Sequence, residues 1–241
     1  MNKTSRKIVP PQLTVKVSAP SSAPMTAEDY VSARRLAAEA EVDARVAETR
    51  ADAAGNAAVS FTWDVYVFGA ESSAAPGTVN LSNLTGDQDF SSPDGLVFSP
   101  ATGIMWIQTD DGAFTDVTNC MMLAALPGTV GDGAKKTLTY AATAGTLTVD
   151  TYVGKAPGED NLKRFLVGPK GSEITGLCET PDGKAIFVNI QHPGESTAQA
   201  DIATPAKYQS QWPSNAGYGA GQRPRSATIV ITKNDGGVIG S

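Results

Sequence analysis

The sequence predicts an all-β protein with an N-terminal helical arm. Its 241 residues include 24 Gly and 15 Pro, and only 18% are charged, against about 25% in a typical globular domain. Short apolar stretches that alternate with polar residues recur through most of the chain, as expected of strands separated by turns. The longest unbroken apolar stretches are a few residues long, as in Cys120–Leu126. A membrane helix needs about 20, so we expect no membrane span.

Residues 1–57 are predicted to form an extended arm followed by a helix. Leu13–Val17 is a short apolar stretch that could add to a sheet as an edge strand. Thr26 and Asp29 are spaced as an N-cap pair, and the Ala-, Glu- and Arg-rich sequence after them runs to about Ala54. Its apolar face is thin, which favours a surface helix or a partner-contacting arm over a coiled coil.

Residues 58–241 are predicted to be all-β. The expected strands are separated by Gly, Pro and Asp turns. They cover Phe61–Phe68, Gly95–Phe98, Ile104–Gln108, Met121–Leu126, Thr137–Ala141, Thr146–Val153, Phe165–Val167, Ile174–Cys178, Ala185–Ile190 and Ala227–Thr232.

An internal repeat is visible among these strands. Gly95–Pro100 leads through a short turn into the apolar Ile104–Asp110, and Gly176–Pro181 leads likewise into Ile186–His192. The two glycines stand 81 positions apart. A strand, a turn, an apolar–aromatic strand and a polar tip are typical of the inner hairpin of a β-propeller blade.

The sequence therefore predicts a partial β-propeller of about two to three blades. A blade takes about 40–50 residues, so a large insertion is expected between the two copies, with Gly128–Asp160 as the candidate. A propeller needs at least ~4 blades to close, and this chain alone is not expected to close a ring.

Composition limits the possible chemistry. A net charge of −6 argues against nucleic-acid binding, which draws its affinity from clustered Lys and Arg. Two cysteines, Cys120 and Cys178, and one histidine, His192, cannot assemble a four-ligand zinc site. The cysteines are compatible with one disulfide or with two free thiols. A metal site would use mainly oxygen ligands, which favours hard cations such as Ca²⁺.

Two acidic residues stand just before the expected inner strands. Asp94 precedes the first copy of the repeat and Glu173 precedes the second. Carboxylates that converge near a propeller axis repel one another, and a multivalent cation relieves that repulsion. Both residues are therefore candidate metal ligands. The alternative for Asp94 is that it only forms a Pro-Asp-Gly turn.

Further candidates follow the second strand of each copy. Asp110 and Asp111 end one such strand, in a cluster that suits calcium but is also an ordinary turn. His192 ends the other, where a hydrogen-bonded structural role is the alternative to a role beside a metal. Arg223 and Arg225 follow a Gly-rich loop, and Arg binds phosphate through a planar set of donors.

Several motifs in a fixed order resemble the C-terminal half of PhoX-type alkaline phosphatases. The resemblance covers about residues 58–241. The motifs are Phe61–Asp64, Ser92–Leu96, Trp106–Asp110, Gly171–Gly176, Thr180–Gly183, Phe187–Glu195 and Arg223–Thr228.

This resemblance implies a secreted bacterial β-propeller hydrolase of phosphomonoesters with a calcium and iron cofactor at the axis. It implies that Glu173, Asp94 and Asp110 are metal ligands and that Arg223 or Arg225 contacts the phosphate. His192 is then a candidate to contact a metal ligand rather than the metal itself. It also implies a periplasmic or extracellular location. The basic N-terminus lacks a following apolar run, so it is not expected to be a secretory signal.

The sequence also departs from the family pattern. The Pro-Glu-Trp and Cys-Thr segments, which supply further metal ligands and a catalytic residue in the family, do not occur in this sequence. No catalytic residue is therefore assigned. Two functions stay open: a phosphatase portion that needs the missing blades, or a non-catalytic structural or assembly protein that keeps the scaffold. Either one predicts a partner, as a homo-oligomer or with the missing propeller half.

Overall fold

The described part of the protein is built from antiparallel sheets. The structure is a computed structural model that describes residues 63–110, 118–129, 131, 133–214 and 221–241. No α-helix occurs within these residues. Two short 3₁₀ turns lie at Gln199–Asp201 and Pro205–Lys207.

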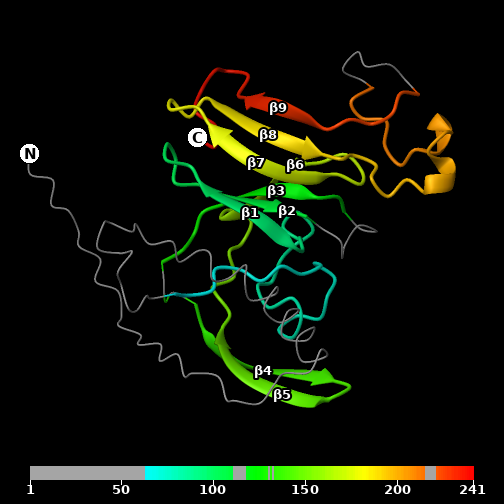
Figure 1. The fold of residues 1–241 in the computed structure, drawn as a ribbon. Coiled ribbons are helices and arrows are strands. Elements are labelled where there is room, and N and C mark those ends of the chain that lie inside the picture. The colour runs from blue at the N-terminus through cyan, green and yellow to red at the C-terminus, as the bar shows by residue number, and fades with distance from the viewer. Residues whose placement is uncertain (1–62, 111–117, 130, 132, 215–220) are drawn as a thin grey trace, which may run out of the picture. The chain divides into compact units, whose positions relative to one another are not determined.

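Within the residues described, nine strands form three sheets (Figure 1). The first sheet has the order β1-β2-β3-β6, the second has the order β7-β8-β9, and β4 pairs only with β5. The strands are β1 Pro93–Phe98, β2 Met105–Thr109, β3 Met121–Ala125, β4 Lys135–Ala142, β5 Gly145–Tyr152, β6 Leu162–Val167, β7 Glu173–Glu179, β8 Ala185–Gln191 and β9 Ala227–Thr232. All strands expected after residue 90 are confirmed to within a few residues.

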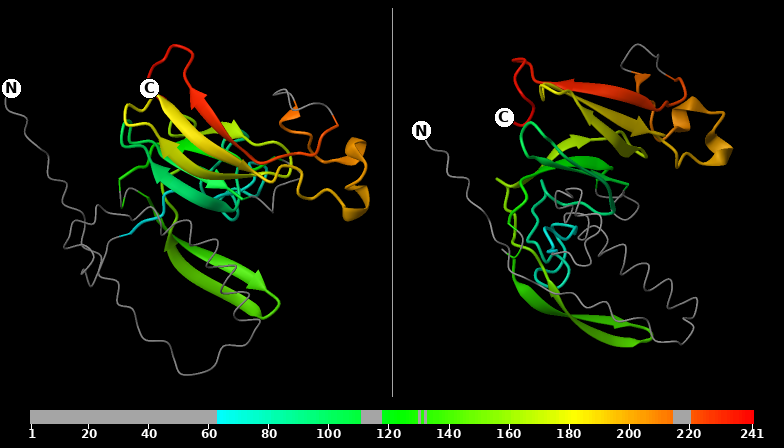
Figure 2. Two further views of the ribbon diagram at one scale, coloured as in Figure 1. Left: turned by 45° about the horizontal axis from the view of Figure 1, so that its top comes forward. Right: turned by 60° about the vertical axis from the view of Figure 1, so that its left-hand side comes forward.

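Two compact units divide the chain. One contains residues 1–68 and 128–156, including the β4–β5 hairpin, and the other contains residues 69–127 and 157–241, including the first and second sheets. Figure 2 shows that the first and second sheets lie side by side as two layers within their unit.

The internal repeat is confirmed in three dimensions. In the β1–β2 hairpin Leu96 pairs with Ile107, and in the β7–β8 hairpin Leu177 pairs with Val188. Each residue of the second pair stands 81 positions after its counterpart in the first pair. The turns close in the same way, because the Ser99 N–H donates to the Ile104 carbonyl and the Thr180 N–H donates to the Ala185 carbonyl. The two hairpins are therefore copies of one structure.

The core of this unit lies between the two sheets. The first sheet contributes one face that includes Trp106 and Met122, and the second contributes Ile186, Val188 and Ile190. All five side chains are buried. This contact stabilises both sheets, since each fully buried aliphatic or aromatic side chain contributes about 1.5–3 kcal/mol.

The other face of the first sheet is buried as well. Its side chains Met105, Ile107, Met121 and Leu123 are at most 2% exposed. The alternation of faces explains why every residue of β2 is buried.

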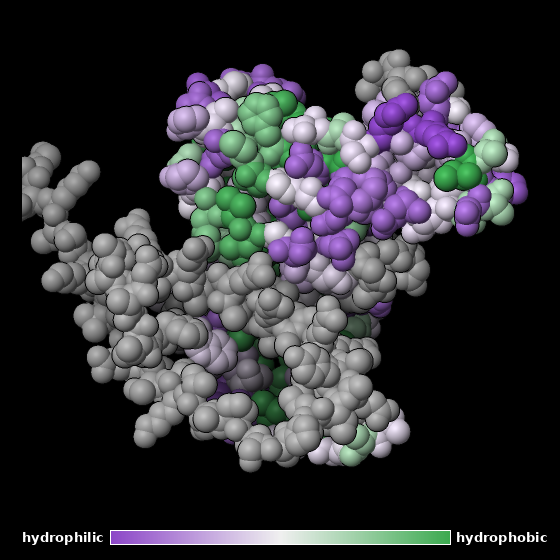
Figure 3. Space-filling model, viewed as in Figure 1, coloured by the Kyte–Doolittle hydropathy of each residue, from purple (hydrophilic) through white to green (hydrophobic). Residues whose placement is uncertain are grey.

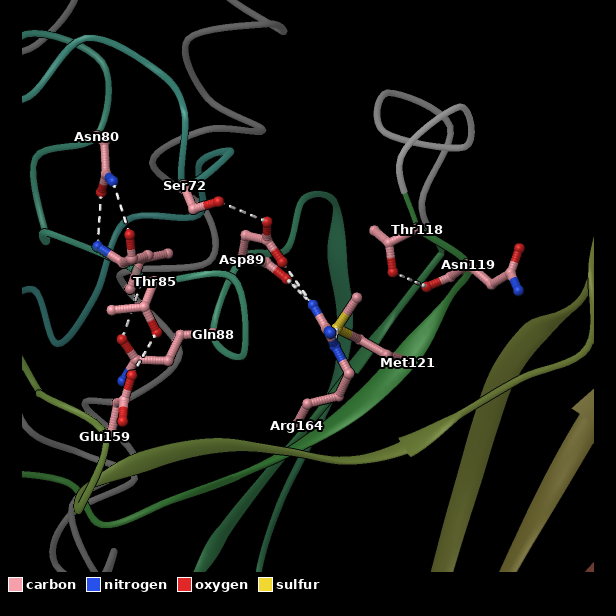
Figure 4. Close-up of polar contacts among 11 residues, drawn as sticks. Ser72, Asn80, Thr85, Gln88, Asp89, Thr118, Asn119, Met121, Glu159 and Arg164 are labelled. Atoms are coloured by element: carbon pink, nitrogen blue, oxygen red, sulfur yellow. Dashed lines mark hydrogen bonds and ion pairs between the residues drawn. The ribbon is translucent and has the colours of Figure 1, made fainter.

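Residues 69–92 contain no strand but are held against β6 by polar contacts (Figure 4). The Arg164 guanidinium forms an ion pair of 2.5 Å with Asp89, whose carboxylate also accepts from the Ser72 hydroxyl. The Gln88 side-chain amide donates to the Leu162 carbonyl at 2.9 Å. These contacts fix the segment that leads into β1.

The insertion expected at Gly128–Asp160 separates β3 from β6. β3 pairs directly with β6, with Ala125 opposite Leu162. Between them the chain makes the β4–β5 hairpin, in which Leu138 pairs with Val149. The insertion thus separates β3 from β6 along the chain, while the two strands stay hydrogen-bonded neighbours in the first sheet.

The predicted strand at Phe61–Phe68 is wrong for the residues described, because Trp63–Phe68 is not a strand. The Asp64 carboxylate accepts hydrogen bonds from the N–H groups of Val65 and Gly131. Trp63 packs edge-on against Tyr152. Side-chain contacts, including two to residues far along the chain, therefore hold this segment in place of a backbone ladder. The predicted arm and helix within residues 1–57 lie outside the described residues.

Neither cysteine forms a disulfide: Cys120 is buried and Cys178 is exposed. Within the described ranges, no helix has the length and hydrophobicity to cross a membrane.

Candidate metal and phosphate site

The strand order places the candidate residues at one end of each sheet. In the first sheet β1 begins where β2 ends, with Pro93 opposite Thr109. In the second sheet β7 begins where β8 ends, with Glu173 opposite Gln191, and β9 begins beside that end. Antiparallel pairing therefore collects Asp94, Asp110, Glu173, His192 and Arg225 near these strand ends. We call this region the acidic edge.

Asp94 and Asp110 are positioned by an irregularity at the start of β1. The register shifts between Pro93 and Gly95, so Asp94 is the extra residue of a β-bulge. Bulges re-aim side chains next to functional sites. The Asp110 N–H donates to the Ser92 carbonyl at 3.0 Å, and Ser92 has a positive φ of 46°. This backbone bond brings Asp94 and Asp110 to the same strand end.

Within the acidic edge, Glu173 of the second sheet lies close to the aspartates of the first sheet. Its side chain is buried. Burial raises the pKa of Glu173 above its ordinary value, and the nearby Asp110 and Asp94 carboxylates raise this pKa further. A hydrogen bond to Asp94 also favours the protonated form. The three carboxyl groups are thus close enough to repel one another when all are charged.

His192 lies between two carboxylates. Its Nε2 is 3.6 Å from Oε2 of Glu173, and its Nδ1 is 3.1 Å from Oε2 of Glu195. The backbone has a positive φ of 35° at His192, and its N–H donates to the Ser226 hydroxyl at 2.9 Å. The imidazole thus lies beside Glu173 on one side and Glu195 on the other.

Sequence reasoning missed Glu195 and Ser226. The spacing of Glu195, three residues after His192, could have indicated the contact, since both stand in one turn. Ser226 could not be found in this way, because it is 34 positions from His192 and is brought to it only by the pairing of β8 with β9.

The two candidate arginines lie on the segment that leads into β9, and both are exposed. The Arg225 N–H donates to the Trp212 carbonyl at 3.1 Å, which fixes the backbone two residues before the strand. The structure places Arg225 at the same end of the second sheet as Glu173 and His192. Asp111 lies outside the described residues.

The acidic edge is an all-oxygen donor set with one imidazole, which fits a hard cation such as Ca²⁺. Among the residues described, however, no group of three or more His, Cys, Asp and Glu side chains is arranged to hold a metal ion. The carboxylates are gathered but would need further donors to enclose a cation.

The fold and this edge define an all-β protein with a repeated hairpin and carboxylates gathered beside two strand ends. The family of alkaline phosphatase PhoX matches residues 37–194. The chain belongs to this family, as the motifs in the sequence indicated.

A solved structure, that of Pseudomonas fluorescens PhoX in complex with vanadate, a transition state analogue, is similar to the chain with 32% sequence identity and a TM-score of 0.53. The similarity covers 79% of this chain and 26% of that one. The chain thus spans about a quarter of the length of this relative. No curated protein matches.

Proposed function

We propose that this chain is a portion of a phosphomonoesterase and that the acidic edge forms part of its metal and phosphate site. The observation that carries the proposal is that Asp94 and Asp110 of the first sheet lie close to the buried Glu173 of the second sheet. Burial raises the pKa of Glu173, and the two aspartates raise it further. Family membership adds the class of chemistry.

The architecture that we propose is a partial β-propeller. The two repeated hairpins would be the inner strands of two blades, with strands β3 and β6 completing the first and β9 extending the second. Closing a ring needs at least ~4 blades. Further blades would therefore come from polypeptide outside this chain, and with them the remaining metal ligands.

Glu173, Asp94 and Asp110 would hold the calcium and iron cofactor that the family implies. Such cations polarise the phosphoryl oxygens and offset the charge of the ester as it is attacked. In this arrangement the carboxylates would bind the cations, and His192 would lie beside Glu173, with Nε2 3.6 Å from its carboxylate.

Arg225 and Arg223 would bind the phosphate group of the substrate. Their guanidinium groups present paired donors to phosphate oxygens. The related Pseudomonas fluorescens PhoX is described with vanadate, which supports a phosphate ester as the class of substrate. A periplasmic or extracellular location is part of this proposal.

The second candidate is a non-catalytic assembly protein that keeps the scaffold. It would keep the two repeated hairpins of the scaffold. The two candidates differ in whether the acidic edge binds a cation.

Calcium binding tests the proposal. Thermal unfolding in millimolar Ca²⁺ and in EDTA should differ, because a ligand that binds only the native state stabilises it. Glu173→Gln should reduce the shift, whereas Glu159→Gln should keep it, since Glu159 contacts Thr85 and not the acidic edge. Equal melting temperatures of the wild type in both conditions would argue against a cation site.

Hydrolysis of p-nitrophenyl phosphate tests the need for further polypeptide. The isolated chain should turn over little or none of it, with or without Ca²⁺ and iron. Robust metal-dependent turnover would show that the site is complete in this chain and that the proposal of missing ligands is wrong.

A further inference from the structure

The β4–β5 hairpin has a polar face and an apolar face. On the polar face the Thr137 hydroxyl donates to the Asp150 carboxylate at 2.6 Å. Successive residues of a strand point to opposite faces, so the residues next to these two meet on the other side. That side is apolar and consists of two cross-strand pairs, Leu138 with Val149 and Tyr140 with Leu147. We call these four residues the Leu138 face.

Leu138 is buried, although the rest of this face is not. Its side chain is 6% exposed, whereas the other three residues of the face are 37–49% exposed. The hairpin is a sheet of two strands, and such a ribbon has no second layer that could enclose a side chain in the middle of its face. Another segment of this chain therefore covers Leu138.

The tip of the hairpin differs from its middle. The tip, residues 141–146, contains only alanine, threonine and glycine. Its surface, at the lower right of Figure 3, is pale, between hydrophilic and hydrophobic. The large apolar side chains are therefore concentrated in the middle of the hairpin, where Leu138 is covered.

The covering segment belongs to the same compact unit as the hairpin. That unit combines the hairpin with residues 1–68. Among the described residues 63–68, Trp63 packs against Tyr152 and the Tyr66 carbonyl lies against Gly154. Both contacts are at the base of the hairpin, where β5 ends. The chain before Trp63 starts from this base, and within the unit it is the segment that can cross the middle.

Residues 26–54, which the sequence predicts to be a helix, contain a regular series of alanines. The series advances in steps of four and three residues, through Ala33, Ala37, Ala40, Ala44, Ala47 and Ala51. Such steps bring side chains to one face of a helix. Small side chains on one element pack well against large ones on the facing element. The alanine series is therefore complementary to the large side chains of the Leu138 face.

The lengths and charges of the two elements also match. A helix rises about 27 Å from Ala33 to Ala51, and the eight residues of β4 extend about 27 Å. Residues 26–54 include seven acidic and four basic residues, whereas the charged residues of the two strands are Lys135, Lys136 and Asp150. Opposite net charges favour the contact.

We infer that the Leu138 face is the docking surface for the helix predicted at residues 26–54 of this same chain. The alanine series lies on the large apolar side chains of the hairpin, and the charged residues between the alanines face water. Of the two roles that the sequence left open, the inference selects a surface helix held by its own chain over an arm that contacts a partner. It does not rest on the proposed function.

Trypsin digestion of the full chain tests this contact. A docked helix protects Arg45 and Arg50, because cleavage requires local unfolding. Leu138→Asp places a carboxylate in the contact, and it should speed cleavage after these arginines at least about tenfold. Thr139→Asp is the matched control, because it lies next to Leu138 on the polar face. It should change the rate less than about twofold. Mass spectrometry identifies the cleaved bonds.

Two variants in the helix cover the case in which Leu138→Asp unfolds the hairpin. Ala44→Glu places a carboxylate in the alanine series, whereas Ala38→Glu places one on another face of the helix. Both replace alanine by glutamate, a good helix former, so helix propensity changes little and equally. Ala44→Glu should speed cleavage after Arg50 at least about tenfold, and Ala38→Glu should leave the rate within about twofold of the wild type.

Disulfide cross-linking identifies what covers the hairpin. Cys178 is exposed and is first replaced by serine. Val149→Cys is then combined with Ala40→Cys or Ala44→Cys, because the middles of the two elements meet whichever way the helix runs. At least one pair should oxidise to a disulfide within one chain, which requires α-carbons within about 7 Å. Val149→Cys with Ala38→Cys should not.

Three results would overturn the inference. The first is cleavage after Arg45 and Arg50 in the wild type as fast as in a peptide of residues 26–54, which would mean that the helix is not docked. The second is a disulfide that joins two chains, which would mean that a second copy covers the Leu138 face. The third is protection of both arginines without a disulfide from either pair, which would place the helix elsewhere.

Discussion

The side-chain amide of Gln108 on β2 donates a 3.0 Å hydrogen bond to the carbonyl oxygen of Gly176 on β7. The bond joins the two sheets at equivalent places in the repeat. Gln108 pairs with Gly95, and Gly176, 81 positions after Gly95, lies beside Asn189 at a bulge where Asn189 pairs with Thr175. A side-chain β-carbon at Gly95 would lie 2.7 Å from the Gln108 oxygen, and one at Gly176 would lie 2.8 Å from the Asn189 nitrogen. Each glycine therefore makes room for an amide on the neighbouring strand.

Gln108→Leu should destabilise the protein by about 1–3 kcal/mol. Gln108 is 2% exposed, and its loss removes the side-chain donor to the Gly176 carbonyl between the sheets. Thermal unfolding should show a drop of about 2–4 °C for each kcal/mol. An unchanged melting temperature would mean that water or another donor replaces the amide.

Gly176→Ala should cost about 1–3 kcal/mol. The φ of 56° at Gly176 is unfavourable for alanine, and the new methyl group would press on Asn189. Gly86→Ala is the matched control, because Gly86 has ordinary backbone geometry and no atom within 4 Å of the added carbon. Denaturant unfolding of the two variants should differ by at least about 1 kcal/mol. Equal midpoints would contradict the local strain.

Arg164→Ala should loosen residues 69–92 and destabilise the protein by about 2–4 kcal/mol, because Asp89 would be left largely buried without its partner. Lys207→Ala removes an ion pair to Asp201 whose lysine is 61% exposed, and it should cost under about 1 kcal/mol. Urea unfolding compares the two. A similar small loss for both would show that the Arg164 pair behaves as a surface contact.

Glu173→Gln should stabilise the metal-free protein near neutral pH. A carboxyl group whose pKa is raised in the folded state destabilises it once the pH exceeds the unfolded pKa, ordinarily about 4.3 for Glu. The destabilisation grows until the folded pKa is passed and then stays constant. Glutamine removes it, so the gain in melting temperature should be present at pH 7.

The same variant should gain little below pH 4, where Glu173 is protonated in both states. Melting curves in EDTA across this range provide the check. A destabilised variant at pH 7 would mean that His192 and the other partners outweigh the repulsion by Asp94 and Asp110.

Periodicity predicted the strands that pair with neighbours close in the chain. The alternation in Ile186–Ile190 and the turn residues before it sufficed for the β7–β8 hairpin, and the 81-residue spacing predicted its copy. The same alternation in Trp63–Phe68 was misleading, because a strand requires a partner strand. Here the Asp64 side chain accepts from the N–H groups of Val65 and of the distant Gly131 instead. An alternating pattern indicates which side chains are buried, but it does not show whether a partner strand is present to pair with the segment.

The acidic edge was predictable residue by residue but not as an arrangement. Asp94 and Glu173 were singled out because each precedes an inner strand. Their meeting depends on a bulge at Asp94 and on the packing of two sheets, which no local pattern encodes. The contact of His192 with Ser226 likewise depends on β9 pairing with β8.

The closing of β3 on β6 makes the segment between them replaceable. The Leu126 N–H donates to the Asn161 carbonyl at 2.8 Å, so the chain leaves and re-enters the first sheet at one point. Polypeptide attached at such a point needs only to bring its ends together, and longer loops cost little more than short ones. The β4–β5 hairpin can therefore be exchanged for a tight turn, or for a whole foreign module, while the four strands keep their register. This position offers evolution and protein engineering a place to graft new modules onto the scaffold.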